Sequence, residues 1–75
     1  MRPRYTIHAR ERMIERNLTE QDIEYVVANY HTMYHDRKGN PNYVGAIGDR
    51  RVRVVVAVGT HPLLIITVIV AEVGG

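Results

Sequence analysis

The fold of this chain is decided by residues 42–58, which read Asn42-Tyr-Val-Gly-Ala-Ile-Gly-Asp-Arg-Arg-Val-Arg-Val-Val-Val-Ala-Val58. Two β-prone runs flank Gly48-Asp49, and a dipeptide of this kind is favoured in two-residue hairpin turns. The pattern predicts strands over residues 42–47 and 50–58. Together they form a β-hairpin at the centre of the predicted sheet.

Side chains alternate across this hairpin, so its two faces differ in chemistry. The even-numbered valines of 52–56 are expected to face the helices, whereas Arg51 and Arg53 point to the opposite face. In the register that a two-residue turn sets, Ala46 lies opposite Arg51 and Val44 lies opposite Arg53. These small neighbours leave the two guanidinium groups accessible.

A first helix is predicted early in the chain. Thr6 is placed to cap it, and it ends near Asn17. Ala9, Met13 and Ile14 supply its apolar stripe. The helix therefore has one face for a core and several charged residues on the remaining surface.

The second helix has the strongest start signal in the sequence. Thr19-Glu-Gln-Asp22 resembles a capping box in which Asp replaces the usual Glu or Gln. Ile23, Val26, Val27 and Tyr30 then recur at i, i+3, i+4 and i+7. This spacing predicts a helix whose core-facing stripe includes all four residues.

The remaining segments complete an α+β fold in the order β-α-α-β-β-β-β. Strands are expected over 4–7, 31–35 and 63–70, and the last is predicted to be central, since its nearly continuous apolar content indicates burial on both faces. We expect one small domain over residues 1–75, with both helices packed on one face of an antiparallel sheet.

Composition limits the class of protein. The chain has 75 residues and no cysteine, which fits a small cytoplasmic protein without disulfides or thiolate metal sites. Its longest apolar stretch, 63–70, is too short to span a membrane. A core this small is close to the limit of independent stability, so a homodimer is expected. No metal or cofactor is expected.

Charge is unevenly distributed along the sequence. Residues 1–17 carry a net +3, residues 18–30 carry −3, residues 31–53 carry +3 and the remainder carries −1, which gives the total of +2. Nine of the ten basic residues are arginine. The distribution favours a phosphate-rich partner such as RNA.

The first helix also carries a candidate anion site. His8, Arg12 and Arg16 are spaced four apart, which places an imidazole and two guanidiniums on one stripe. Forked arginines suit phosphate, and histidine exchanges protons near neutral pH. The alternative interpretation is a solvated basic face whose charge is offset by Glu11 and Glu15.

These residues carry a resemblance to a known family. The motif His8-Ala-Arg-Glu-Arg-Met-Ile-Glu-Arg16, the Thr19 cap and the segment Ile65-Ile-Thr-Val68 resemble a prokaryotic family designated domain of unknown function 4258. That family is similar in topology to toxin-type ribonucleases of the RelE and barnase-EndoU-colicin groups. The resemblance implies cleavage of RNA without a metal, and a protein antitoxin as a further partner. In contrast to RelE-type toxins, this chain does not end in a basic segment.

The candidate site residues follow from that chemistry, which needs an acid or base and cations for the phosphate charge. His8 is the first candidate for acid–base work, with His61, His31 and His35 behind it. The predicted catalytic set is His8, Arg12 and Arg16. Arg51, Arg53 and Tyr43 are predicted to bind nucleic acid, with Thr67 in support.

Each assignment has a structural alternative. Arg51 and Arg53 can protect an edge strand from aggregation. Arg12 can tie the first helix to the sheet, and Thr67 can bond only to backbone. Three functions therefore stay open: a metal-independent ribonuclease, a non-catalytic nucleic-acid-binding module, and a homodimeric structural or assembly protein.

Overall fold

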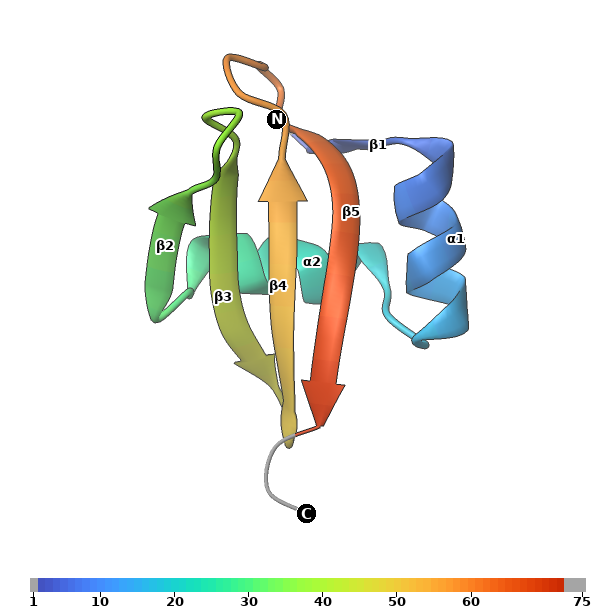
Figure 1. The fold of residues 1–75 in the computed structure, drawn as a ribbon. Helices are drawn as coiled ribbons and strands as arrows, with labels where there is room; N and C mark the ends of the chain where they lie inside the picture. The colour runs from blue at the N-terminus through green and yellow to red at the C-terminus, as the bar shows by residue number, and fades with distance from the viewer. Residues whose placement is uncertain (1, 73–75) are drawn as a thin grey trace.

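The computed structural model describes residues 2–72, which form an α+β fold of five strands and two helices (Figure 1). The elements are β1 (Arg4–Tyr5), α1 (Ile7–Glu15), α2 (Glu20–Ala28), β2 (Thr32–His35), β3 (Pro41–Ile47), β4 (Arg50–Val56) and β5 (Leu64–Glu72). The predicted order β-α-α-β-β-β-β is confirmed. Neither helix of residues 2–72 is long and apolar enough to cross a membrane.

The strands form one sheet in the order β1-β5-β4-β3-β2. Neighbouring strands are antiparallel except β1 and β5, which run parallel. The prediction of a wholly antiparallel sheet is therefore wrong at this edge. Parallel neighbours need a long connection, and here both helices and three strands separate β1 from β5.

The predicted hairpin is confirmed together with its register. Gly48 and Asp49 form the turn between β3 and β4, and Gly48 adopts a φ of 61° that few other residues tolerate. Ala46 pairs with Arg51 and Val44 pairs with Arg53, as the two-residue turn predicts.

Both predicted helix caps are present. The Thr6 side chain accepts a hydrogen bond from the Ala9 amide, so the chain is already helical at Ile7 and β1 is shorter than expected. At α2, the Thr19 hydroxyl accepts from the Asp22 amide at 3.1 Å while the Asp22 carboxylate accepts from the Thr19 amide at 2.9 Å. Asp22 thus completes the capping box.

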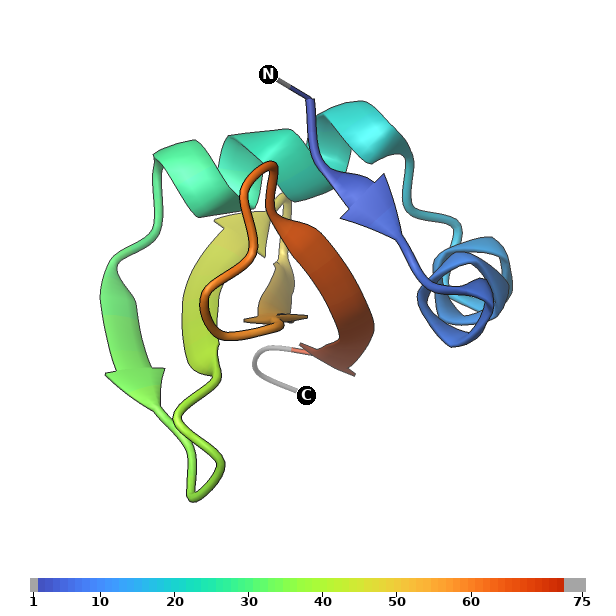
Figure 2. The ribbon, with the colours of Figure 1, turned by 90° about the horizontal axis from the view of Figure 1, so that it is seen from above.

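The core lies between the helices and one face of the sheet. Figures 1 and 2 place α2 across β3 and β4 and place α1 beside β5. Gly45 allows a close approach of α2, because a Cβ there would lie 3.3 Å from Cγ1 of Val26. The buried cluster consists of Ala9, Met13, Leu18, Ile23, Val26, Val52, Val54, Val56, Ile65 and Val68.

Two residues predicted for the core lie outside it. Ile14 is 80% exposed, because Ala9 and Met13 define the buried stripe of α1 and Ile14 lies about 100° further round the helix. Tyr30 follows the end of α2 and is exposed, with its ring packed edge-on against Tyr43.

The last strand is covered on one face only. Ile65 and Val68 are buried against the helices, whereas Ile66, Thr67 and Ile69 are half-buried. The prediction of burial on both faces is wrong, since no helix among residues 2–72 covers the second face. An apolar run can thus line a sheet whose far face stays open.

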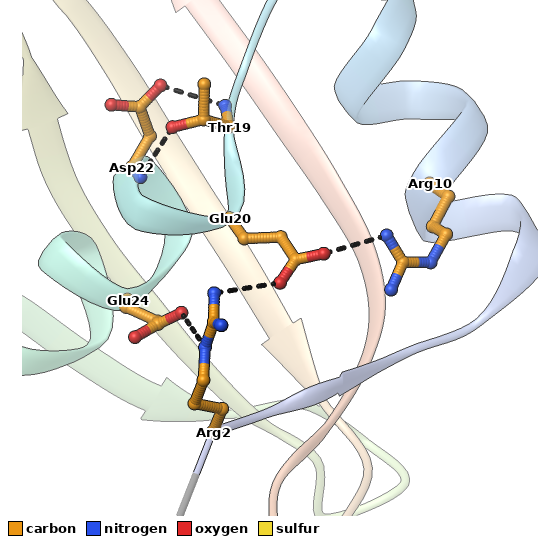
Figure 3. A network of polar contacts seen from close by, with 6 residues as sticks. All are labelled: Arg2, Arg10, Thr19, Glu20, Asp22 and Glu24. Carbon is orange, nitrogen blue, oxygen red and sulfur yellow. Dashed lines mark hydrogen bonds and ion pairs between the residues drawn. The ribbon is translucent and has the colours of Figure 1, made fainter.

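Arginines near the N-terminus pair with the acidic start of α2 (Figure 3). Arg2 contacts Glu20 at 3.2 Å and Glu24 at 3.4 Å, and Arg10 contacts Glu20 at 3.0 Å. The Arg10 guanidinium also lies 4.9 Å from the centre of the Tyr5 ring. These contacts join the two helices. They also neutralise part of the acidic charge at the start of α2, which lies apart from the basic segments in the sequence.

Candidate nucleic-acid interface

The sheet has a face that neither helix covers, which we call the helix-free face (Figure 1, where α2 lies behind the strands). Val52, Val54 and Val56 point into the core. Arg51, Arg53 and Val55 alternate with these valines, so they and their own partners on the neighbouring strands point the other way. The helix-free face comprises Thr32, Tyr34, Asn42, Val44, Ala46, Arg51, Arg53, Val55, Thr67, Ile69 and Ala71.

Arg53 lies near the centre of this face and is held by two neighbours. Its Nη1 donates to Oη of Tyr34 at 2.8 Å and to Oδ1 of Asn42 at 3.0 Å. Asn42 is only 1% exposed, and its Nδ2 donates to the carbonyl oxygen of Asn40 at 2.9 Å. The guanidinium is therefore oriented from two strands, β2 and β3, before any ligand arrives.

The other edge of the Arg53 guanidinium is available. The two Nη1 hydrogens are used by Tyr34 and Asn42, whereas Nε and Nη2 donate to no atom of residues 2–72 and are not buried. Nε–H and Nη2–H point in parallel, which is the arrangement that binds two oxygens of one phosphate. We call this pair the free edge of Arg53.

Two hollows of the surface meet at Arg53. The larger, of about 450 Å³, is lined by Asp36, Arg37, Lys38, Asn40, Asn42, Arg53, Val55, Ile66 and Thr67. The smaller, of about 210 Å³, is lined by Val44, Arg51, Arg53, Ile69 and Ala71. We call the larger one the basic pocket, because three cations line it against one carboxylate.

That carboxylate belongs to Asp36, and the loop after β2 already engages it. Its Oδ1 accepts from the amides of Lys38 at 2.9 Å and Asn40 at 3.0 Å. Desolvation raises the pKa of Asp36, but these backbone N–H groups and the Asn42 side chain outweigh it, so the pKa lies below its usual value. The carboxylate stabilises the loop that carries Arg37 and Lys38.

On α1, His8 lies on the side of the helix away from α2. Arg10 pairs with Glu20 of α2, and His8 and Arg10 flank the buried Ala9 by about 100° on opposite sides. The imidazole of His8 is exposed. The first turn of α1 thus presents an exposed histidine on the side opposite Arg10 and α2.

The two arginines of the predicted stripe are in different surroundings. Arg12 is half-buried, with its Nη1 3.3 Å from Glu15 and its Nε buried without a hydrogen-bond partner among residues 2–72. Arg16 follows the last residue of α1 as its C-cap, and its carbonyl oxygen accepts from Nη1 of Arg50 at 2.6 Å. Only His8 and Arg12 lie within the helix itself.

A hydrogen bond joins the start of α1 to the basic pocket. The hydroxyl of Thr6 donates to the carbonyl oxygen of Ile66 at 2.8 Å, and Ile66 lines that pocket. Thr67 lines it as well and shares it with Arg53. Since α1 lies beside β5 and Arg53 is on β4, one strand separates the two groups of predicted residues.

Tyr43 is not part of this face. It packs against Tyr30, with ring centres 5.1 Å apart, and borders the core on the side of the helices. Tyr34 is the aromatic residue that contacts Arg53 instead. Alternation along 31–35 places Tyr34 and Thr32 on the same face of their strand. The contact with Arg53 could not be predicted from this, because the register against β3 depends on the loop 36–40, which has no standard turn length.

The remaining histidines lie elsewhere on the surface. His31, His35 and His61 are all exposed. Within residues 2–72, no group of three or more His, Asp or Glu side chains is arranged to hold a metal ion.

Comparison with known proteins assigns the chain to a family. The family model described as Domain of unknown function (DUF4258) matches residues 5–70. The chain belongs to this family. The DUF4258 match spans both helices and every residue of the helix-free face except Ala71. No curated protein and no solved structure matches the chain.

Proposed function

We propose that this protein binds RNA on its helix-free face, with a backbone phosphate held by Arg53. The observation that carries the proposal is the free edge of Arg53, which Tyr34 and Asn42 orient while leaving Nε–H and Nη2–H accessible. An arginine fixed in this way binds two phosphate oxygens with little further loss of side-chain freedom.

The charge around Arg53 supports the same ligand. Arg37 and Lys38 line the basic pocket and Arg51 lines the smaller hollow, so cations extend to both sides of Arg53. None of the four ion pairs among residues 2–72 involves these side chains. A row of unpaired cations suits a polyanion better than a single small anion.

Metal-independent cleavage of the bound RNA is the second candidate, and the bond between Thr6 and Ile66 favours it. That contact ties the start of α1, where His8 lies two residues further on, to β5, the strand that contributes Ile66 and Thr67 to the basic pocket. In the proposed reaction, His8 takes the proton of a 2′-hydroxyl, whose oxygen attacks phosphorus. The bond to the 5′-oxygen breaks, and His8 returns the proton to that oxygen.

The choice of RNA rests on this chemistry and on the predicted similarity in topology to RelE-type and barnase-EndoU-colicin ribonucleases. The 2′-hydroxyl supplies a nucleophile, so a histidine and arginines suffice. A toxin role with an antitoxin partner belongs to the same proposal. The homodimer and the cytoplasmic location stay predictions from the sequence.

Binding is tested by fluorescence anisotropy of a labelled RNA over a series of salt concentrations. Arg53→Gln is expected to weaken binding about 10-fold or more and to reduce the slope of log affinity against log salt by about 1. Arg53→Lys keeps the charge but loses the free edge, and should also weaken binding. Arg10→Gln is the matched control, since Arg10 pairs with Glu20 on the other side of the molecule.

Equal losses in Arg53→Gln and Arg10→Gln would mean that binding follows net charge and would contradict the assigned face. Absence of salt-dependent binding would reject the function altogether. Circular dichroism of each variant confirms that it is folded.

Cleavage is tested by incubating the protein with RNA in EDTA, with DNA of the same sequence as a control that lacks the 2′-hydroxyl. His8→Ala should abolish cleavage, whereas His61→Ala, which removes another exposed histidine, should retain it. The expected product ends in a 2′,3′-cyclic phosphate. If the protein binds RNA but the RNA stays intact, the binding function is supported and the catalytic function is rejected.

A further inference from the structure

Tyr34 is the one aromatic side chain on the helix-free face of residues 2–72, and it is 42% exposed. It lies on β2 at the edge of the sheet, directly paired with Asn42 of β3. The proposed phosphate contact uses only the free edge of Arg53. The ring of Tyr34 therefore has no role in that contact beyond its hydroxyl group.

The position of the ring follows from its hydrogen bond. Tyr34 and Arg53 lie on strands separated by β3, which places their backbones about 10 Å apart. Their side chains nevertheless meet at 2.8 Å, so both reach toward each other over the sheet. Beneath them Asn42 is almost completely covered. The Tyr34 side chain thus extends along the sheet toward β4, and 42% of the residue stays exposed.

This arrangement places an aromatic surface directly beside a phosphate-binding group. A nucleotide carries a flat base and a phosphate in close proximity, which matches an exposed ring joined to the free edge of Arg53. Stacking of a base on an aromatic side chain accepts every base, because each base has a π-face. It requires that the base be unstacked from its neighbours, which an intact duplex does not allow.

We infer that the substrate class is single-stranded RNA, with one base stacked on Tyr34 while the adjacent phosphate is bound by Arg53. This inference rests on the proposed RNA-binding function and adds strand selectivity to it. Neighbouring phosphates extend toward Arg37 and Lys38 on one side and toward Arg51 on the other.

The experiment compares a labelled single strand with a blunt duplex that contains the same sequence. The protein should prefer the single strand. Tyr34→Leu should weaken binding of the single strand by about 10-fold relative to Tyr34→Phe, the scale of one lost stacking contact, whereas the two variants should bind the duplex equally well. Both variants lose the hydrogen bond to Arg53, so Tyr34→Phe, which keeps the ring, reports the smaller loss caused by poorer orientation of Arg53 alone.

A second measurement reads stacking directly. The chain has no tryptophan, so Tyr34→Trp introduces a single indole whose fluorescence a stacked base quenches. Tyr25→Trp is the matched control, because Tyr25 is exposed on α2, away from the helix-free face. Single-stranded RNA should quench the first variant and leave the second unchanged.

The outcomes separate the two proposals. If Arg53→Gln weakens RNA binding while Tyr34→Leu does not, and Tyr34→Trp is not quenched, the stacking inference is overturned and the proposed function stands. Equal affinity for the single strand and the duplex overturns it as well. If no variant and no parent protein binds RNA, the proposed function fails first.

Discussion

The two faces of the sheet are built from the same strands yet have opposite properties. On the face covered by the helices, Val52, Val54 and Val56 are fully buried and belong to the hydrophobic core cluster. On the helix-free face, the half-buried Arg53 donates hydrogen bonds to the exposed Tyr34 and to the buried Asn42. Because strand side chains alternate, one sequence can supply stability on one face and recognition on the other.

Substitutions on the two faces should therefore have different effects. Burial of apolar area dominates the free energy of folding, so the covered face should control stability. The helix-free face exposes polar groups whose interactions with water are nearly as favourable as those with the protein. Its exposed residues should control ligand affinity and affect stability less, with Asn42, Val44 and Val55 as exceptions because they are buried.

The largest effect is expected from Ile23→Ala. Ile23 is fully buried where α2 packs on the sheet, and its truncation should lower the free energy of unfolding by about 3 kcal/mol. Urea denaturation followed by circular dichroism measures the loss. Ile14→Ala is the control, because Ile14 is 80% exposed and should change stability by less than about 0.5 kcal/mol.

RNA affinity of the folded Ile23→Ala protein should equal that of the parent. A reduced affinity in the folded fraction would mean that the two faces are coupled.

Asn42→Ala is expected to affect both properties. It leaves Nη1 of Arg53 with one partner and removes the donor to the carbonyl of Asn40, which should cost about 1–3 kcal/mol. RNA affinity should fall as well, since Arg53 is less well oriented. Asn29→Ala, at the exposed end of α2, is the control for loss of an amide that donates to a backbone carbonyl. Equal costs for the two variants would disprove a special role for the buried amide.

Gly45→Ala tests the close contact between α2 and β3. The added Cβ would lie 3.3 Å from Cγ1 of Val26, which is completely buried, so we expect a loss of about 1 kcal/mol. A double-mutant cycle with Val26→Ala measures the coupling, because truncation of Val26 makes room for the new methyl group. If the cost of Gly45→Ala is the same in both backgrounds, the contact with Val26 is not its cause.

The smallest effect at neutral pH is expected from Tyr5→Phe. The Tyr5 hydroxyl is buried without a hydrogen-bond partner among residues 2–72, so its removal should be close to neutral or stabilising. Desolvation by burial, followed by the charges of Glu20 and Glu24, raises the pKa of Tyr5 from 10.0 to about 12.

The sign of the pH dependence follows from that shift. The folded state keeps the Tyr5 proton more tightly than the unfolded state, so this contribution to stability is complete below pH 10 and is lost as pH rises toward about 12. The free energy of unfolding should therefore decline over this window in the parent and less steeply in Tyr5→Phe. The exposed Tyr25→Phe should keep the parent's slope, and equal slopes in all three proteins would contradict the assignment.

Much of the fold could be predicted from the sequence because its signals are local. The capping box at Thr19 and Asp22 forms between residues three apart, and the turn at Gly48-Asp49 fixes the register of β3 against β4. That register placed Arg51 and Arg53 on the face away from the valines. The core stripes of the helices were predicted less well at their ends, where Ile14 and Tyr30 are exposed.

The sequence by itself thus determined the order of the elements, the central hairpin and the candidate arginines, since each depends on residues near one another in the chain. Only the tertiary structure decided which side chains meet. Arg53 contacts Tyr34 across 19 positions and Asn42 across 11, the parallel pairing of β1 with β5 spans nearly the whole chain, and Tyr43 turns toward the helices. These contacts depend on strand order and on the register across the loop 36–40, which no local hydrogen bond or periodicity specifies in advance.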